Sequence, residues 1–184
     1  MTVARTAVLA TAVAGLTVLS GCVAPAMVEG RNWVDGPQAS RAATYPERAL
    51  RQEVDGWAVL RCVAGPEHRV ENCVLIAESP QGFGFGEIGL GMQGGMRAVD
   101  ASVFHGHVPV EGEWFSFPVR FCHEGPSAPC EARLNEELMA FFAEMHPIER
   151  LSQAGRCSEA IDAAEKVGQP SFVRIIEQQC AKQR

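Results

Sequence analysis

Cysteine is the residue type of this chain with the most evident chemistry, and the spacing of the cysteines separates them into two groups. Cys22 directly follows an apolar N-terminal run, whereas the other six lie between Cys62 and Cys180. Six cysteines can close three disulfide bonds in an oxidising compartment. The sequence has no Cys-x-x-Cys spacing of the kind that redox thiol pairs use. We therefore expect six structural cysteines and a separate role for Cys22.

The N-terminal segment is typical of an export signal. Arg5 precedes an uncharged apolar run, and the run ends at Leu19. This run of about 15 residues is shorter than the roughly 20 that a membrane-spanning helix requires. The sequence "LSGC" that ends at Cys22 is similar to the bacterial lipobox, in which the signal peptide is removed before a cysteine that then carries lipid. We expect a lipidated Cys22; the alternative is cleavage nearby, with Cys22 a spare thiol.

The positions of predicted turns indicate which of the remaining cysteines pair. One pair lies at equal distances from the turn at Pro66–Arg69, one brackets the proline-containing loop "HEGPSAP", and one is equidistant from the turn "VGQP". Each bond is expected to contribute about 2 to 4 kcal/mol by restricting the unfolded chain. The expected disulfides are Cys62–Cys73, Cys122–Cys130 and Cys157–Cys180.

Two histidines in "FHGHV" are the best candidates for metal binding. His105 and His107 would point to the same side of an extended segment, and His123 or a carboxylate would supply a third ligand. Histidines in such loops are more often simply solvated. Ser79 lacks the Gly-x-Ser-x-Gly context of an activated nucleophile, and "GFGFGEIGLG" lacks the lysine of a phosphate loop. We therefore expect no enzyme activity, no metal and no cofactor.

Composition gives no indication of nucleic-acid binding, and the organisation of the chain predicts one small domain with a segment before it and a helical extension after it. The chain has 184 residues and a net charge of −6, with its basic residues scattered, so we expect no nucleic-acid partner. The region after Cys22 is small, polar and punctuated by Gly and Pro, which predicts a tether spanning only ~25 Å. The expected divisions are a lipoprotein-type signal peptide at 1–21, a tether at 22–44, a domain at 45–122 and a helical extension at 123–184.

Hydrophobic periodicity predicts the elements of the central domain. A helix is expected between Pro46 and the stop signal Gly56, followed by strands near 57–64 and 69–77. With Cys62 opposite Cys73, Leu60 would lie opposite Leu75 and Ala58 opposite Ala77. The glycine-rich segment that contains Ile88, Leu90, Met92 and Met96 is expected to be a second helix, although each glycine weakens it by ~1 kcal/mol.

The segment "WFSFPVRF", residues 114–121, is the clearest strand. Phenylalanine and valine alternate with the residues Trp114, Ser116, Pro118 and Arg120. Because Pro118 has no N–H to donate, this strand is expected at a sheet edge. These elements predict an α+β fold, with a small antiparallel three-stranded sheet and two helices on one face.

Beyond Cys130 the pattern becomes helical. "EARLNEELMAFFAEMHP" places apolar residues near one face and predicts a helix that ends before Pro147. A helical hairpin is expected to follow around "VGQP", closed by Cys157 and Cys180. We interpret this region as a disulfide-stapled helical extension that caps the central domain.

The order of motifs in the central domain resembles a known family. "YPERALRQEVDGWAVLRC", "VLIAESPQGFGFGEIGL" and "PVEGEWFSFPVRF" together are similar to the C-terminal domain of TonB, over residues 45–121. The resemblance implies a periplasmic domain that meets outer-membrane transporters and accepts a short transporter segment against a sheet edge. Carried onto this chain, the implied docking strand is 114–121, with the outward residues Trp114, Ser116, Pro118 and Arg120 as its partner-binding set.

The N-terminal region departs from that family. TonB has a transmembrane helix coupled to an inner-membrane motor and a long Pro-rich spacer, whereas this chain has a lipobox-like signal and a short tether. We expect a non-enzymatic protein-binding module in the bacterial periplasm, held to a membrane by lipid, whose partner is an outer-membrane transporter segment or another envelope protein. One alternative is a structural envelope lipoprotein without a role in transport. The other is a metal-binding protein that uses His105 and His107.

Overall fold

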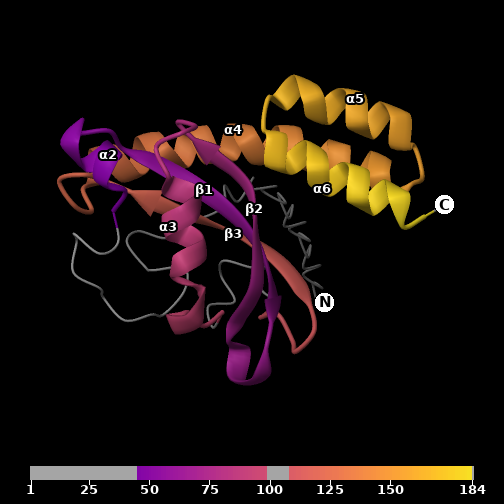
Figure 1. The fold of residues 1–184 in the computed structure, drawn as a ribbon, viewed down its shortest axis with the longest axis horizontal. Helices are drawn as coiled ribbons and strands as arrows, with labels where there is room; N and C mark the ends of the chain where they lie inside the picture. Colours follow the sequence, from indigo (N-terminus) through magenta and orange to yellow (C-terminus); the bar gives the residue numbers. More distant parts are fainter. Residues whose placement is uncertain (1–44, 99–107, 184) are drawn as a thin grey trace, which may run out of the picture. The chain divides into compact units, whose positions relative to one another are not determined.

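The computed structural model describes residues 45–98 and 108–183, in which three strands form one antiparallel sheet. The strands are β1 (Gly56–Ala64), β2 (Val70–Ser79) and β3 (Trp114–Phe121), and their order in the sheet is β2-β1-β3 (Figure 1). This confirms the expected α+β class with a three-stranded antiparallel sheet. It also confirms that the strand containing Pro118 lies at an edge.

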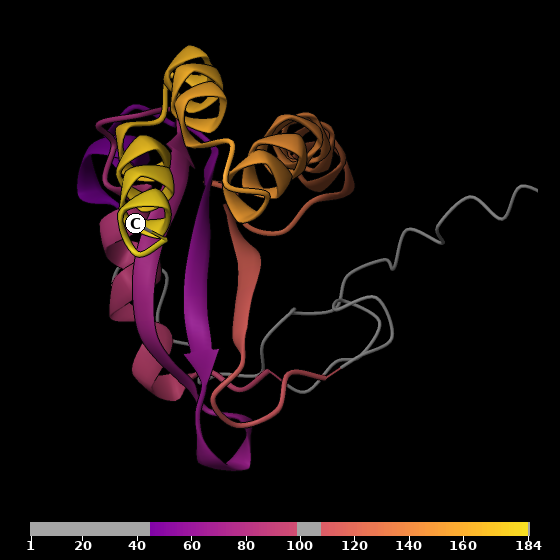
Figure 2. The same ribbon diagram turned by 90° about the vertical axis from the view of Figure 1, so that its right-hand side faces the viewer.

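Helices cover both faces of this sheet. The short helices α2 (Glu47–Arg51) and α3 (Phe85–Gly91) accompany one face; the 3₁₀ turn η1 (Pro66–His68) forms the tip of the β1–β2 hairpin, and η2 (Gln93–Gly95) follows α3. The C-terminal helices pack against the other face (Figures 1 and 2). They are α4 (Ala128–Gln153), α5 (Cys157–Val167) and α6 (Pro170–Ala181).

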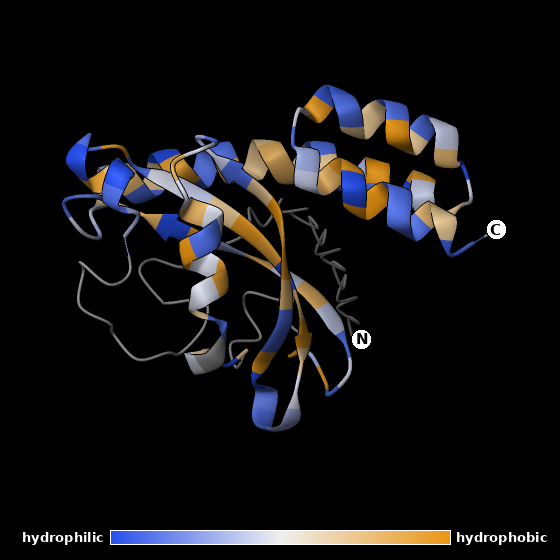
Figure 3. Ribbon diagram, viewed as in Figure 1, coloured by the Kyte–Doolittle hydropathy of each residue, from blue (hydrophilic) through white to orange (hydrophobic). Residues whose placement is uncertain are grey.

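The alternation of side chains along β1 explains the two helical layers. Ala58 and Leu60 belong to clusters on the α2–α3 side, whereas Trp57 and Val59 belong to the cluster with α4 to α6. All four side chains are buried, because each face of a strand must cover its apolar residues. In the view coloured by hydropathy, the strands contain apolar stretches and the hairpin tip at η1 is more hydrophilic (Figure 3).

The pairing of β1 with β2 is partly as expected. Leu60 lies opposite Leu75, as predicted. The register shifts between Val59 and Leu60, so that Val59 lies opposite Ala77 and Ala58 lies opposite Glu78. The predicted Ala58–Ala77 pair is therefore wrong, because one extra residue of β2 is accommodated at this irregularity.

Glycines let α3 lie close to the sheet. A Cβ atom placed on Gly86 would come within 2.4 Å of the Leu75 side chain, and one on Gly56 would come within 2.2 Å of the Phe85 ring. Any larger residue at either position would push the helix from the strands. The glycines thus have a packing role that offsets their low helix propensity.

Two predicted helix ends are wrong. The first helix ends at Arg51 rather than at Gly56, and Glu53 just beyond it adopts a positive φ of 54°. Helix α4 continues through Pro147 instead of ending before it. The residues that follow, Ile148 and Ser152, are buried in the core, and this packing outweighs the hydrogen bond that proline cannot make.

The three disulfide bonds join the pairs that the turn positions predict. Cys62–Cys73 links β1 to β2 beside η1, Cys122–Cys130 closes the loop between β3 and α4, and Cys157–Cys180 staples α5 to α6. The Cα atoms of the last pair lie 5.6 Å apart across the helical hairpin.

The helical extension shares one core with the sheet. Trp57 of β1 packs against Phe141 of α4, with ring centroids 5.4 Å apart, and Phe141 in turn lies 6.2 Å from Phe172 of α6. Leu134, Met145 and other α4 residues join the same cluster. The extension therefore contributes the hydrophobic layer that covers the second face of the sheet.

Candidate functional site

The outer edge of β3 presents alternate backbone groups away from the sheet. The N–H of Ala64 donates to the carbonyl of Glu113 at 2.9 Å, just before β3, which fixes the pairing phase of the two strands. In an antiparallel ladder, residues alternate between bonding toward the neighbour strand and away from it. The even-numbered residues of β3 therefore direct their N–H and C=O groups outward. No strand of the described residues pairs with that outer edge.

Pro118 occupies one of the outward positions. Its missing N–H would point away from β1, so the ladder between the two strands loses no bond. The outward N–H groups of Trp114 and Ser116 remain as donors at the beginning of β3. Proline thus interrupts the edge without weakening the sheet, which is a known way to limit indiscriminate strand pairing.

The opposite edge of the sheet, on β2, is covered by other parts of the chain. The side-chain oxygen of Gln169 accepts from the N–H of Glu78 at 3.3 Å, and its amide nitrogen donates to the Glu78 carbonyl at 3.2 Å. Further along β2, the N–H of Cys73 donates to the side chain of Gln93 at 3.0 Å, and the N–H of Val70 donates to the Met96 carbonyl at 3.1 Å. The β2 edge is thus closed at three positions.

The side chains of the four predicted partner-binding residues differ in exposure. Trp114 is 57% exposed, and Ser116 is half-buried with its hydroxyl accepting from the Arg61 guanidinium at 3.4 Å. Pro118 is buried, and Arg120 donates to the side chain of Asn135 in α4. Trp114, at the beginning of the strand, is therefore the most exposed of the four, Ser116 and Arg120 are half-buried, and Pro118 is covered.

Helix α4 is fastened to the sheet beside β3 by polar contacts at two levels. Arg61 of β1 forms an ion pair with Glu149, both side chains being largely buried. Arg120 of β3 bonds Asn135, near the other end of the helix, and burial lowers the pKa of Arg120 while the charge of Glu131 opposes that shift. The guanidinium nevertheless stays charged at neutral pH. These contacts hold the sheet, including β3, against α4. They are made by side chains and do not use the backbone groups at the outer edge of β3.

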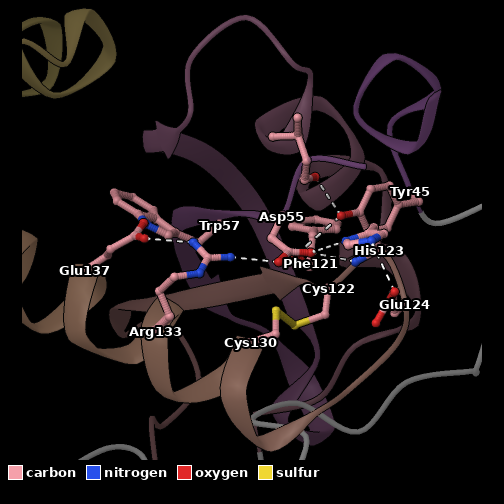
Figure 4. A network of polar contacts seen from close by, with 11 residues as sticks. Tyr45, Asp55, Trp57, Phe121, Cys122, His123, Glu124, Cys130, Arg133 and Glu137 are labelled. Carbon is pink, nitrogen blue, oxygen red and sulfur yellow. Dashed lines mark hydrogen bonds and ion pairs between the residues drawn. A yellow bond between two sulfur atoms is a disulfide. The ribbon is translucent and has the colours of Figure 1, made fainter. Parts of the chain in front are cut away.

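A polar network joins the end of β3 to the start of β1 and to α4 (Figure 4). The Asp55 carboxylate accepts from the backbone N–H of His123 and from its Nδ1, both at 2.8 Å, and from Arg133 at 2.7 Å. Arg133 also donates to Glu137 at 2.9 Å, and Glu137 accepts from the indole of Trp57 at 3.1 Å. The network connects three elements whose sequence positions are far apart.

The environment of Asp55 favours its charged form. Partial burial disfavours the carboxylate, but the hydrogen bonds from His123 and Arg133 outweigh that cost and lower the pKa of Asp55. On the far side of the ring, Nε2 of His123 lies 3.8 Å from Glu124. The imidazole thus lies between two carboxylates. We call the contacts of Asp55 with His123 and Arg133 the Asp55 clasp.

The space beside this network is small. The pocket next to His123 has a volume of about 40 Å³ and is lined in part by the Cys122–Cys130 bridge. Ligand pockets usually measure ~300 to 1,000 Å³, so this one has room for little more than water. Within the two described ranges, no group of three or more His, Cys, Asp or Glu side chains could hold a metal ion.

Several predicted site residues lie outside the described residues. These are His105 and His107 of the candidate metal site, and Cys22 of the predicted lipidation site. Among the helices described from Tyr45 onward, none is both long enough and apolar enough to cross a membrane.

The sequence did not indicate the residues that close the β2 edge. Gln169 lies 91 positions from Glu78 and Gln93 lies 20 from Cys73, and glutamines in turns are common. The hydrogen bonds of Asp55 with His123 and Arg133 also join residues that lie far apart in the sequence, so the sequence did not indicate them. One local signal was present: Gln169 lies directly before Pro170, the proline that begins α6. A polar residue in that place marks the start of a helix.

No protein-family model matches the chain, and no curated protein matches it. A solved structure of the TonB2 protein from Vibrio anguillarum is similar to 50% of this chain and to 85% of that chain, at 18% sequence identity and a TM-score of 0.35.

Proposed function

We propose that this chain is a protein-binding module that takes up an extended segment of an envelope partner along the outer edge of β3. The observation that carries the proposal is the difference between the two sheet edges. The β2 edge is closed by Gln93, Met96 and Gln169, whereas outward backbone groups of β3 are aligned for one more strand. An added strand would gain main-chain hydrogen bonds from Trp114 and Ser116.

The side chains beside this edge provide selectivity. Trp114 offers a large exposed apolar surface next to the incoming strand, and aromatic residues are enriched where proteins bind one another. Because the contact is short and Pro118 removes one donor, we expect an interface below ~1,200 Å² and an affinity on the order of micromolar.

The cellular setting in this proposal comes from the sequence. The resemblance of residues 45–121 to the TonB C-terminal domain supports a periplasmic partner, such as an outer-membrane transporter segment. The lipobox-like signal supports a lipid anchor at Cys22 rather than a motor-coupled helix. In this proposal the module recruits or positions its partner, without energy transduction through a spanning helix.

Capture of the partner tests the proposal. A photo-crosslinking amino acid at position 114 should yield an adduct with a periplasmic segment of an envelope protein in living cells. The same group at position 50 is the matched control, because Leu50 on α2 is also a large exposed apolar residue. Equal labelling from both positions, or no labelling from position 114, would instead favour the second candidate, a structural envelope lipoprotein.

A further inference from the structure

Two large apolar side chains are exposed near the beginning of β3. Trp114 is 57% exposed and Val110, four positions earlier, is 58% exposed. A tight turn separates them, in which the N–H of Glu113 donates to the Val110 carbonyl at 2.9 Å. We call Val110 and Trp114 the Trp114 patch. Covering these exposed apolar surfaces is favourable, so the two side chains favour an apolar cover.

The chain that precedes the described domain leaves from the opposite end of the same strand. The ring of Tyr45 packs edge-on against Phe121, the last residue of β3, with centroids 5.9 Å apart. Its hydroxyl donates to the Val54 carbonyl at 2.8 Å, so its position is fixed. The chain before Tyr45 therefore begins beside the last residue of β3.

The length of that preceding segment is sufficient to return along the edge. From Phe121 back to Trp114, β3 spans roughly 23 Å at ~3.3 Å per residue. From Tyr45 back to Trp33 the chain can extend to roughly 40 Å. Trp33 can thus reach the Trp114 patch with several residues of slack. A segment placed in this way runs parallel to β3.

The composition of the segment identifies which residues would dock. Between Glu29 and Thr44, the only large apolar residues are Trp33 and Val34. The rest are small, polar or charged. One aromatic and one aliphatic side chain in the segment thus match the one aromatic and one aliphatic side chain exposed in the patch.

We propose that Trp33 and Val34 dock on the Trp114 patch, so that the chain's own N-terminal segment occupies the start of the β3 edge. The docked segment competes with any partner strand for the backbone groups of Trp114 and Ser116. That competition rests on the proposed function, whereas the docking itself does not. A partner must displace a tethered competitor, which makes the edge selective for segments that bind more strongly.

Fluorine NMR of the full chain, labelled with fluorotryptophan, tests the docking. The chain has three tryptophans, at positions 33, 57 and 114, so each resonance can be assigned with single Trp→Phe variants. Trp33→Ala should shift the Trp114 resonance and increase its sensitivity to solvent, while the matched control Gln38→Ala leaves it unchanged. Neither substitution lies in the described fold, so both variants should fold and unfold cooperatively; Gln38→Ala should keep the wild-type Tm, and Trp33→Ala should lower it slightly because a docking contact is lost.

Two results would overturn the docking. One is a Trp114 resonance that does not respond to Trp33→Ala. The other is a response that changes with protein concentration, because a second copy of the chain would then be the occupant. In cells, Trp33→Ala should raise partner adducts from position 116 several-fold. If no adduct forms in either variant while the Trp114 resonance still shifts, the proposed function fails and the docking stands.

Discussion

The side-chain amide of Gln169 hydrogen-bonds both backbone groups of Glu78, accepting at 3.3 Å and donating at 3.2 Å. The amide therefore takes the place of a neighbouring strand at the end of β2. It comes from the turn between α5 and α6, so the helical extension protects one edge of the sheet as well as covering one face. Since strand edges are sites of unwanted pairing, this contact protects the end of β2 from an added strand.

We expect Gln169→Ala to lower the free energy of unfolding by about 1 to 2 kcal/mol, because two hydrogen bonds to β2 are lost. Urea denaturation measures this change. The variant should also self-associate more at high concentration, since the Glu78 backbone groups become available. Gln178→Ala, on the exposed surface of α6, is the matched control and should change neither property. Equal behaviour of the two variants would show that the edge is closed by other contacts.

Two glycines of α3 should respond oppositely to alanine. Gly86→Ala should destabilise the protein by about 1 to 3 kcal/mol, because the added methyl meets Leu75. Gly91→Ala should be neutral or stabilising by up to ~1 kcal/mol, because nothing lies within 4 Å of its Cβ position. Thermal denaturation of both variants compares the effects directly. A Tm for Gly86→Ala at or above that of Gly91→Ala would contradict the close packing of α3.

The Asp55 clasp should make stability depend on pH in the acid range. Its hydrogen bonds hold the folded pKa below the unfolded value of about 3.9, so the stabilisation is present above roughly pH 4 and is lost as the pH falls through the folded pKa. Asp55→Asn should therefore be less stable than the wild type near pH 7, and the difference should shrink below roughly pH 4. Denaturation curves across this range test it, with the exposed Asp162→Asn as control. A difference that grows on acidification would refute the clasp.

Lipidation of Cys22 remains a prediction from the sequence. Mass spectrometry of protein extracted from membranes should find a mature chain whose first residue is an acylated Cys22. Cys22→Ser should remain unprocessed and should not carry acyl chains, since serine lacks the thiol that is modified. A mature wild-type chain that begins at another residue would show ordinary signal cleavage instead.

Local patterns were sufficient where the structure depends on local geometry. The alternation in 114–121 predicted β3 with its observed bounds, and turn symmetry together with loop length predicted the three cysteine pairs. Pro118 predicted the edge position because a missing donor is tolerated only where no ladder bond is needed.

Features that depend on distant packing were not predictable. Pro147 is a helix-ending signal, yet α4 passes through it because Ile148 and Ser152 are buried beyond it. The register shift between Val59 and Leu60 could not be predicted, because the apolar residues of β1 alternate regularly across it. At the candidate site, the strand and its edge position were predicted, but the burial of Pro118 and the closure of the other edge by Gln169 were not, since the latter joins residues 91 positions apart.

The central claim is that the partner's backbone adds to the outer edge of β3, and substitution of Ser116 tests it most directly. Ser116→Pro removes an outward N–H without removing a bond to β1, as Pro118 already does two positions later, whereas Ser116→Ala keeps that N–H and removes only the hydroxyl. With the photo-crosslinking group at position 114, we expect Ser116→Pro to lower the partner adduct about tenfold and Ser116→Ala to leave it near the wild-type yield, in chains that are shown by their thermal transitions to be folded. Equal adduct yields from the folded proline and alanine variants would contradict strand addition at this edge.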